Sequence, residues 1–260
     1  PFQVGVFASR ATFMSGNAAI RACQDLKEKL KKYTARLLEV ESDELAVGNY
    51  GVFVKADPDK RMSMAEIGAA ANYPSATADV FLCGIGTYHP GGPQTVDPKT
   101  GEMPLLAAAA FATGIVEVEV DTETGVVEVT KAVHVYDVGK AINPLMCQCQ
   151  INGGSAMGIG MSLSEDAHPY WPEVDFAVET LGDYVMATAA DMPADNQHAI
   201  VEVEHPDGPF GAKGFCEMSA NIQIPAVAAA IHDAIGVWLT QFPMTPEAVL
   251  KALESHQSQG

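Results

Sequence analysis

The 260-residue sequence has few basic residues and no long apolar run. Lys and Arg together number 15 against 33 Asp and Glu, which gives a formal net charge of −18. A protein that binds phosphate backbones needs a positive field, so this balance weighs against a nucleic-acid partner. The longest apolar stretches are alanine-rich and fall short of the ~20 residues that cross a bilayer. We therefore expect no membrane span.

Cysteines are also few, and they form no disulfide framework. An odd number without regular spacing is typical of a reduced compartment, so we expect a cytoplasmic protein. Cys147 and Cys149 have the spacing of half a metal site, but no second pair or nearby histidine completes it, which favours ordinary buried thiols. The cysteines are Cys23, Cys83, Cys147, Cys149 and Cys216.

Apolar residues recur with helical spacing in several segments. The length of 260 residues is enough for one large domain or two modest ones, and a hydrophobic content of 48% indicates a globular chain. Ser63 and Glu66 have the spacing of a capping box, and Thr245 precedes a short periodic segment. The predicted helices are an amphipathic one opened by residues 15–17 and reaching Leu37, one from Ser63 to about Ala71, an alanine-rich one over residues 224–236, and one over residues 245–253.

Valine alternates with acidic residues between residues 114 and 135, with a turn at residues 123–125. This pattern predicts a β-hairpin with one solvent-facing side. Residues 48–54 and 201–204 also have strand-like patterns. Helices and amphipathic strands in one chain predict an α+β fold.

Two segments are irregular or rich in small residues. Residues 84–104 carry many glycines and prolines, which suits either the wall of a substrate entrance or a subunit contact. The small residues between Gly153 and Gly160 suit close helix packing or a helix N-terminus open to a phosphate-bearing ligand, and packing is slightly favoured.

Three glycines lie within residues 208–214, shortly before Glu217. Glycine lets a backbone approach a bound group closely, and Lys213 supplies a cation nearby. A carboxylate in this setting can serve as a positioned general base. The alternative is a capping or solvated glutamate, which is the commoner role of an isolated carboxylate. A hydrolase with Ser9 or Cys216 as nucleophile is a further alternative, but no Gly-x-Ser-x-Gly elbow supports it.

Four segments, in chain order, resemble landmarks of the xanthine oxidase family of molybdenum hydroxylases. Four motifs in register are more specific than one glycine motif. The segments are Ala8-Ser9-Arg10 with Gly16-Asn17-Ala18, Phe111 to Asp121, Asp137 to Gly154, and Asp183 to Glu217.

The resemblance implies the C-terminal half of the molybdenum-cofactor-binding domain of that family, over residues 1–260. The chain resembles the medium molybdopterin subunit of split enzymes such as nicotinate dehydrogenase, so the complementary portion is expected on another chain. The upstream glycine loop, the arginine-bearing substrate segment and the iron–sulfur and flavin domains are absent from these residues.

The resemblance also implies site roles. Glu217 is expected to take a proton from a molybdenum-bound hydroxide. No side chain is expected to ligate the metal, although the Ala8 backbone is expected near its ligands. The cofactor is expected to be molybdopterin in its cytosine dinucleotide form. The expected cofactor-binding residues are Ala8, Ser9, Arg10, Gln150, Lys213 and Gly214.

The implied function is oxygen insertion at an electron-poor carbon of a nitrogen heterocycle, purine or aldehyde. The implied partners are a second molybdopterin subunit, an iron–sulfur subunit and a flavin subunit that carries FAD. Cys216 and Met218 depart from the family pattern beside Glu217. These departures leave the Glu217 assignment standing, and they are the main support for the alternative, a non-catalytic assembly subunit that retains the fold.

Overall fold

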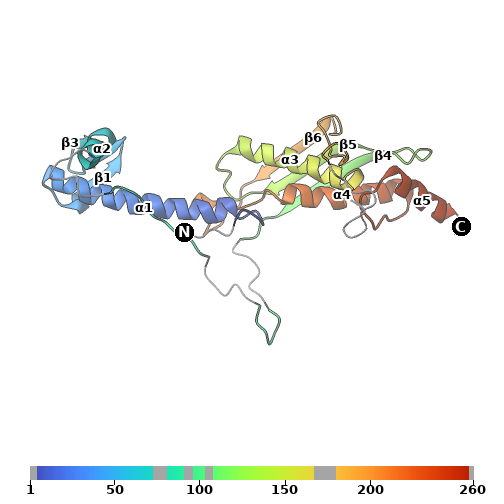
Figure 1. The fold of residues 1–260 in the computed structure, drawn as a ribbon, viewed down its shortest axis with the longest axis horizontal. Helices are drawn as coiled ribbons and strands as arrows, with labels where there is room; N and C mark the ends of the chain where they lie inside the picture. Colours follow the sequence, from blue (N-terminus) through green and yellow to red (C-terminus); the bar gives the residue numbers. More distant parts are fainter. Residues whose placement is uncertain (1–4, 73–80, 91–95, 103–107, 167–179, 258–260) are drawn as a thin grey trace. The chain divides into compact units, whose positions relative to one another are not determined.

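The computed structural model describes residues 5–72, 81–90, 96–102, 108–166 and 180–257. The chain divides into two compact units (Figure 1). Unit 1 contains residues 1–10 and 108–260, and unit 2 contains residues 11–107. No helix in the described part of the chain has the length and hydropathy that a membrane crossing requires.

Unit 2 packs one long helix and one short helix against a small antiparallel sheet in the order β1-β2-β3. Leu30 and Tyr33 of the long helix lie in its core with Leu45, Val52 and Ile67. The elements are α1 (Ala11–Leu38), the 3-10 helix η1 (Ser42–Glu44), β1 (Leu45–Gly48), β2 (Gly51–Val54), β3 (Asp57–Ser63) and α2 (Met64–Asn72).

Both helices predicted for unit 2 are confirmed, but the start predicted for the long one at residues 15–17 is wrong, since α1 begins at Ala11. The capping box forms as expected, because Glu66 N donates to Ser63 Oγ at 3.2 Å and Ser63 N donates to Glu66 Oε2 at 2.8 Å. The single strand predicted over residues 48–54 is wrong. Asn49 and Tyr50 both have positive φ, 48° and 57°, and form a hairpin turn between β1 and β2.

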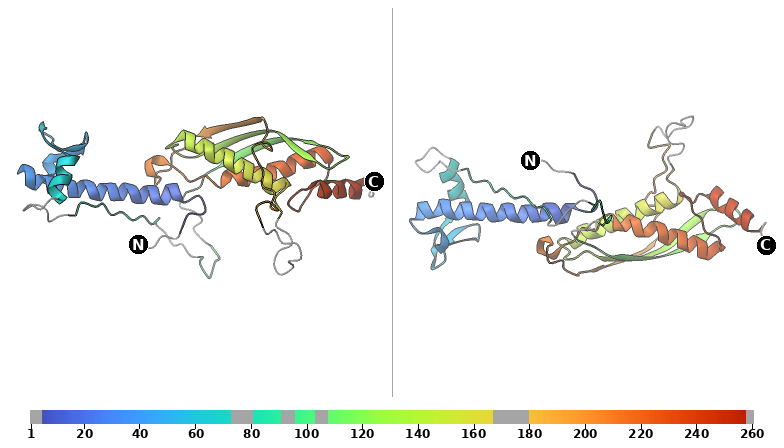
Figure 2. Two further views of the ribbon diagram at one scale, coloured as in Figure 1. Left: turned by 45° about the horizontal axis from the view of Figure 1, so that its top comes forward. Right: turned by 90° about the horizontal axis from the view of Figure 1, so that it is seen from below.

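Unit 1 is a three-stranded sheet, in the order β4-β5-β6, with helices packed on it (Figure 2). β4 and β5 form the predicted hairpin, and β6 adds parallel to β5. Val116, Ile159 and Val227 lie in the core between sheet and helices. The elements are β4 (Ala112–Val120), β5 (Val127–Asp137), α3 (Pro144–Leu163), β6 (Asp195–Val201), the 3-10 helix η2 (Pro209–Gly211), α4 (Met218–Ile235) and α5 (Pro246–Gln257).

Several boundaries in unit 1 differ from the sequence predictions, among them the end of α5, which lies at Gln257 and not at Leu253. The strand predicted over residues 201–204 is wrong, because β6 ends at Val201 and Glu202 instead bonds Lys140 and the Ala141 amide. The alanine-rich helix begins at Met218, so Pro225 lies inside it. Its end at Gly236 and the Thr245 cap of α5 are as predicted.

Glycines on α3 let this helix approach α4 closely. A Cβ on Gly154 would lie 1.7 Å from Ser219 Oγ, and one on Gly158 would lie 2.4 Å from Gln223 Cβ. The run of small residues therefore serves helix packing. It does not open a helix N-terminus, since α3 starts at Pro144 with Asn143 as its cap.

Gly154→Ala should destabilise the protein by about 1–3 kcal/mol, because the added methyl group overlaps Ser219. Gly153→Ala on the same helix is the matched control, since an added Cβ there would meet no atom within 4 Å beyond the neighbouring helix backbone. The control should be neutral or stabilising by up to about 1 kcal/mol. Urea unfolding of both variants measures the difference, and equal effects would contradict the packing role.

His134 is fully buried between the sheet and α4. Burial lowers its pKa, the Gln223 side chain partly offsets this, and His198 lowers it further. The unfolded chain therefore binds a proton at a higher pH than the folded chain does. Stability from this residue is fully present above the unfolded pKa of about 6.5 and is lost as the pH falls below it.

We expect the melting temperature to fall between about pH 7.5 and 5.5, and His134→Gln to flatten this dependence. His256→Gln is the control, since His256 is exposed near the end of α5. Scanning fluorimetry across this pH range makes the comparison. An unchanged slope in His134→Gln would show that other groups cause the pH dependence.

Candidate active site

Glu217 directly precedes α4 and binds the N-terminal segment of unit 1. Its side chain makes no capping hydrogen bond with α4, so the capping alternative is wrong. Instead, Glu217 Oε1 accepts a hydrogen bond from Ala8 N at 2.9 Å, and Glu217 N donates to Ser9 Oγ at 3.0 Å. Among the described residues, no hydrogen-bond partner lies at the other carboxylate oxygen, Oε2.

A pocket of about 470 Å³ opens beside Glu217. One wall comes from α3 and includes Gln150, and the other comes from the start of α4. Ser219 Oγ lies 3.2 Å from the Gln150 carbonyl oxygen and 2.8 Å from that of Cys216, so it joins the two walls. The lining residues are Cys149, Gln150, Gly153, Gly154, Met157, Met161, Cys216, Glu217, Ala220 and Asn221.

The loop before Glu217 is fixed to the end of β5. Lys213 Nζ lies 2.6 Å from Asp137 Oδ2, and the two side chains are only 7% and 12% exposed. The backbone contacts continue this attachment, since Lys213 N donates to Val138 O at 2.9 Å and Lys140 N donates to Gly211 O at 3.0 Å. Lys213 thus pairs with the carboxylate of Asp137 rather than with Glu217.

The ion pair sets the ionisation of Asp137. Burial raises the pKa of its carboxyl group, but the hydrogen bond from Lys213, the amide of Gly139 and the lysine charge outweigh this effect. The net pKa is lowered, so Asp137 stays ionised at neutral pH.

Gly214 lies against the N-terminal segment. A Cβ at this position would lie 1.7 Å from Ser9 O, so only glycine permits the approach. The sequence predicted that the backbone here approaches a bound group closely. In the structure, Gly214 instead approaches the backbone of Ser9.

The predicted site residues do not all converge. Ala8 and Ser9 bind Glu217, Gly214 packs against Ser9, and Gln150 lines the same pocket as Glu217. Arg10 instead lies over the Phe7 ring at 5.1 Å from its centroid. The cofactor roles of these residues stay predictions.

Sequence reasoning missed two structural partners of the site, Asp137 as the counterion of Lys213 and Ser219 as the bridge between the walls. Asp137 is 76 residues from Lys213, and no local pattern links them.

The two cysteines that precede Gln150 differ in solvent exposure. Cys147 is buried, which raises the pKa of its thiol, and Cys149 is exposed at the pocket. Across the described residues, no group of three His, Cys, Asp or Glu side chains is arranged to hold a metal ion.

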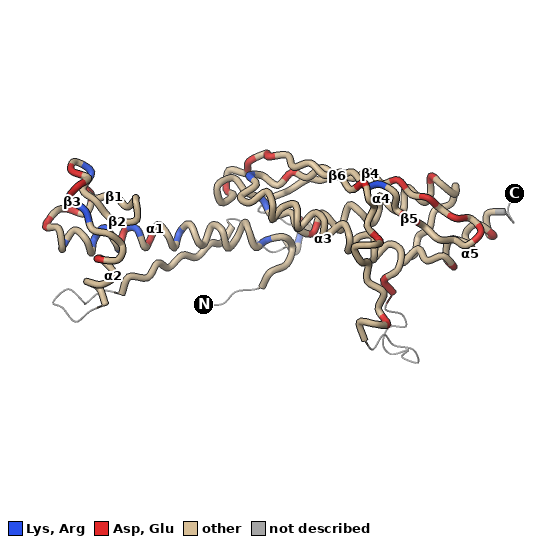
Figure 3. The backbone as a smooth tube through the Cα atoms, turned by 90° about the horizontal axis from the view of Figure 1, so that it is seen from above, with Lys and Arg blue, Asp and Glu red and all other residues tan. Residues whose placement is uncertain are grey.

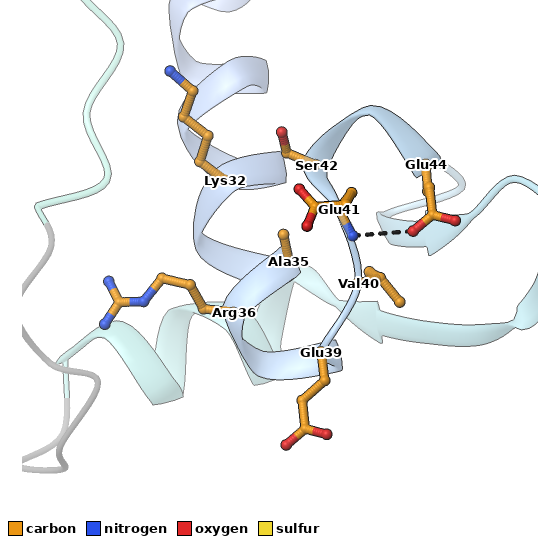
Figure 4. A pocket seen from close by; sticks show the side chains of 8 residues that line it. All are labelled: Lys32, Ala35, Arg36, Glu39, Val40, Glu41, Ser42 and Glu44. Atoms are coloured by element: carbon orange, nitrogen blue, oxygen red, sulfur yellow. Dashed lines mark hydrogen bonds between the residues drawn. The ribbon is translucent and has the colours of Figure 1, made fainter.

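Unit 2 has a separate pocket of about 620 Å³ at the C-terminal end of α1 (Figure 4). Lys32 and Arg36 extend from the helix, and three glutamates lie in the segment that follows it. The backbone amide of Glu41 donates to Glu44 at 3.0 Å. None of the predicted site residues lies here. Acidic residues are spread over both units (Figure 3).

Comparison with known proteins gives consistent matches. The model of the molybdopterin cofactor-binding domain family matches residues 1–193. The probable hypoxanthine oxidase of Escherichia coli (strain K12) is 33% identical over 253 residues, which cover 97% of this chain and 24% of that protein. The gamma subunit of the 6-hydroxypseudooxynicotine dehydrogenase complex of Paenarthrobacter nicotinovorans is 30% identical, with coverages of 96% and 30%.

Solved structures agree with these relatives. Quinoline 2-oxidoreductase from Pseudomonas putida 86 superposes with a TM-score of 0.72 at 30% identity, covering 97% of this chain and 31% of that chain. Aldehyde oxidoreductase from Desulfovibrio gigas gives 0.72 at 27% identity, with coverages of 95% and 23%. The chain thus spans 23% to 31% of the length of these proteins. The resemblance to the xanthine oxidase family and the predicted α+β domain are confirmed.

Asp137→Asn should destabilise the protein by about 3–5 kcal/mol, because it leaves the buried ammonium group of Lys213 without a counterion. The double variant Asp137→Asn with Lys213→Met should lose less than the sum of the single variants, since no uncompensated charge remains. Urea unfolding gives the four free energies. Strict additivity would show that the two side chains do not interact.

Lys140→Met is the control for this cycle. Lys140 pairs with Glu202, and both side chains are exposed, at 45% and 39%. Exposed pairs contribute little, so this variant should be much less destabilising than Asp137→Asn.

Proposed function

Because the chain belongs to the molybdopterin cofactor-binding domain family, we propose that it forms part of the cofactor site of a molybdenum-dependent hydroxylase, with Glu217 as general base. The observation that carries the proposal is the setting of Glu217. Its carboxylate lines a pocket together with Gln150, and one carboxylate oxygen is held by a backbone amide from a distant segment.

The pocket residues fit a flat group with polar edges. Gly153, Gly154 and Ala220 leave room beside the helix backbones, and Gln150 and Asn221 supply amides that both donate and accept hydrogen bonds. We propose that Gln150 and the backbone of Ala8, Ser9 and Gly214 contact a molybdopterin, in its cytosine dinucleotide form. Lys213 and Arg10 are less suited to this role, because Lys213 is buried against Asp137 and Arg10 stacks on Phe7.

Glu217 has the properties of a base. Oε1 is held by the Ala8 amide, which orients the carboxylate, while Oε2 has no hydrogen-bond partner in the described structure. An oriented carboxylate with one oxygen available can accept a proton from a water-derived nucleophile. When bound, the molybdenum centre supplies the redox chemistry that a protein side chain lacks.

The substrate class and partners follow from the relatives. Their names include a hypoxanthine oxidase, a quinoline oxidoreductase and an aldehyde oxidoreductase, so we propose a nitrogen heterocycle, purine or aldehyde as the substrate. One relative is named as a subunit of a dehydrogenase complex. We propose a complex with a second molybdopterin-binding portion, an iron–sulfur subunit and a flavin subunit with FAD. The five free cysteines suit a cytoplasmic location.

Glu217→Gln tests the assignment in the assembled complex. The variant should retain molybdenum and pterin but lose most turnover, by about 10²–10⁴-fold, because the amide cannot accept the proton. The assay combines elemental analysis with turnover on hypoxanthine, quinoline and an aldehyde.

Glu119→Gln is the control, because Glu119 is an exposed carboxylate of the hairpin. Normal turnover of Glu217→Gln would refute the general base. If the wild-type complex also bound its cofactor only through other chains, the non-catalytic assembly role would be supported instead.

A further inference from the structure

The turn at Ala8 and Ser9 makes three polar contacts with the segment around Glu217. Ala8 N donates to Glu217 Oε1 at 2.9 Å, and Ser9 Oγ accepts from Glu217 N at 3.0 Å. Cys216 Sγ lies 3.5 Å from the same Ser9 oxygen. The Ser9 hydroxyl therefore lies where two neighbouring groups of the Glu217 segment meet.

The turn adopts a conformation that its own residues disfavour. Ala8 and Ser9 have φ of 52° and 54°, in the left-handed region that non-glycine residues rarely occupy. Such a conformation persists where surrounding contacts hold it. Those contacts include the hydrogen bonds to Glu217 and the hydrogen bond across the turn, which Arg10 N donates to Phe7 O at 3.2 Å.

The loop before Glu217 has a glycine, Gly214, where it comes closest to this turn. Gly214 lies against Ser9 O, and a Cβ there would lie 1.7 Å from that oxygen. The turn and the loop are thus in direct backbone contact. Glu217 is three residues beyond this contact.

We propose that Ser9 is a positioning residue that holds the Glu217 carboxylate in its working orientation. This rests on the proposed function of Glu217 as base. The Ser9 hydroxyl fixes the Glu217 backbone amide, and the left-handed turn that Ser9 shares with Ala8 presents the Ala8 amide to the carboxylate. It takes up no proton itself.

Turnover kinetics of the assembled complex test the role. Ser9→Ala should lower kcat by about 10- to 100-fold with little change in KM, because a shifted base affects the reaction more than substrate binding. In a Glu217→Gln background, Ser9→Ala should cost no further activity, because the group that it positions is already inactive.

Two other substitutions separate the hydroxyl from the backbone conformation. Ser9→Gly relaxes the left-handed turn but lacks the oxygen, so it should lose activity as Ser9→Ala does. Ser9→Asn tolerates this turn and offers a side-chain oxygen acceptor, so it should recover part of kcat. Ser164→Ala is the control, since its hydroxyl donates to Val185 O at 2.9 Å away from Glu217.

Hydrogen exchange gives a readout that is independent of activity. Ser9→Ala should speed exchange in the peptide that covers residues 214–219, because Glu217 N loses its acceptor. Glu217→Ala should speed exchange in residues 7–10, because the Ala8 amide loses the carboxylate. Glu119→Ala should leave both peptides unchanged.

The outcomes distinguish the two proposals. If Glu217→Gln keeps normal turnover, the proposed function fails and the role of Ser9 fails with it. If Glu217→Gln is inactive but Ser9→Ala keeps normal kcat, only the role of Ser9 is overturned. An additional loss from Ser9→Ala in the Glu217→Gln background, or unchanged exchange at residues 214–219, also overturns it.

Discussion

The close contact between α3 and α4 is the constraint on which the candidate site depends. Gly154 and Gly158 place no side chain of α3 toward α4, and a Cβ at either position would overlap Ser219 or Gln223 of α4. Because the helices approach here, Ser219 Oγ comes within hydrogen-bonding distance of the carbonyl oxygens of Gln150 and Cys216. The two walls of the pocket are therefore held together by packing and by one shared hydroxyl group, before any ligand contributes.

A second constraint acts on the loop that carries Glu217. The Asp137–Lys213 pair is nearly buried, and such pairs add little net stability because both charges are desolvated. Its contribution here is geometric, since it joins the loop to the end of β5 where backbone hydrogen bonds continue the attachment. The N-terminal segment holds the same loop from another side through Ser9. The segment that carries Glu217 is thus held by two elements distant in sequence, the end of β5 and the N-terminal segment.

Local signals predicted the elements that local interactions determine. The capping box at Ser63, the Thr245 cap and the hairpin over residues 114–135 each have a short-range pattern with a physical cause. The failures occur where tertiary contacts decide. Met218 begins α4 because Ser219 and Gln223 pack on α3, although Pro225 suggested a later start. The turn at Asn49 and Tyr50 lacks the glycine that usually marks such a turn.

The distinction between local signals and tertiary contacts also applies to the candidate site. Glu217 stands out in the sequence because glycines surround it and because its segment resembles a known family, whereas its partner is a backbone amide 209 residues away. A backbone donor has no side-chain signature, so its role cannot be read from residue type. Ala8 and Ser9 also give no sign of their left-handed conformation, which glycine would have suggested. Since polar groups oriented by the protein need little reorganisation during a reaction, this arrangement suits the base role that we propose for Glu217, although the residue is exposed.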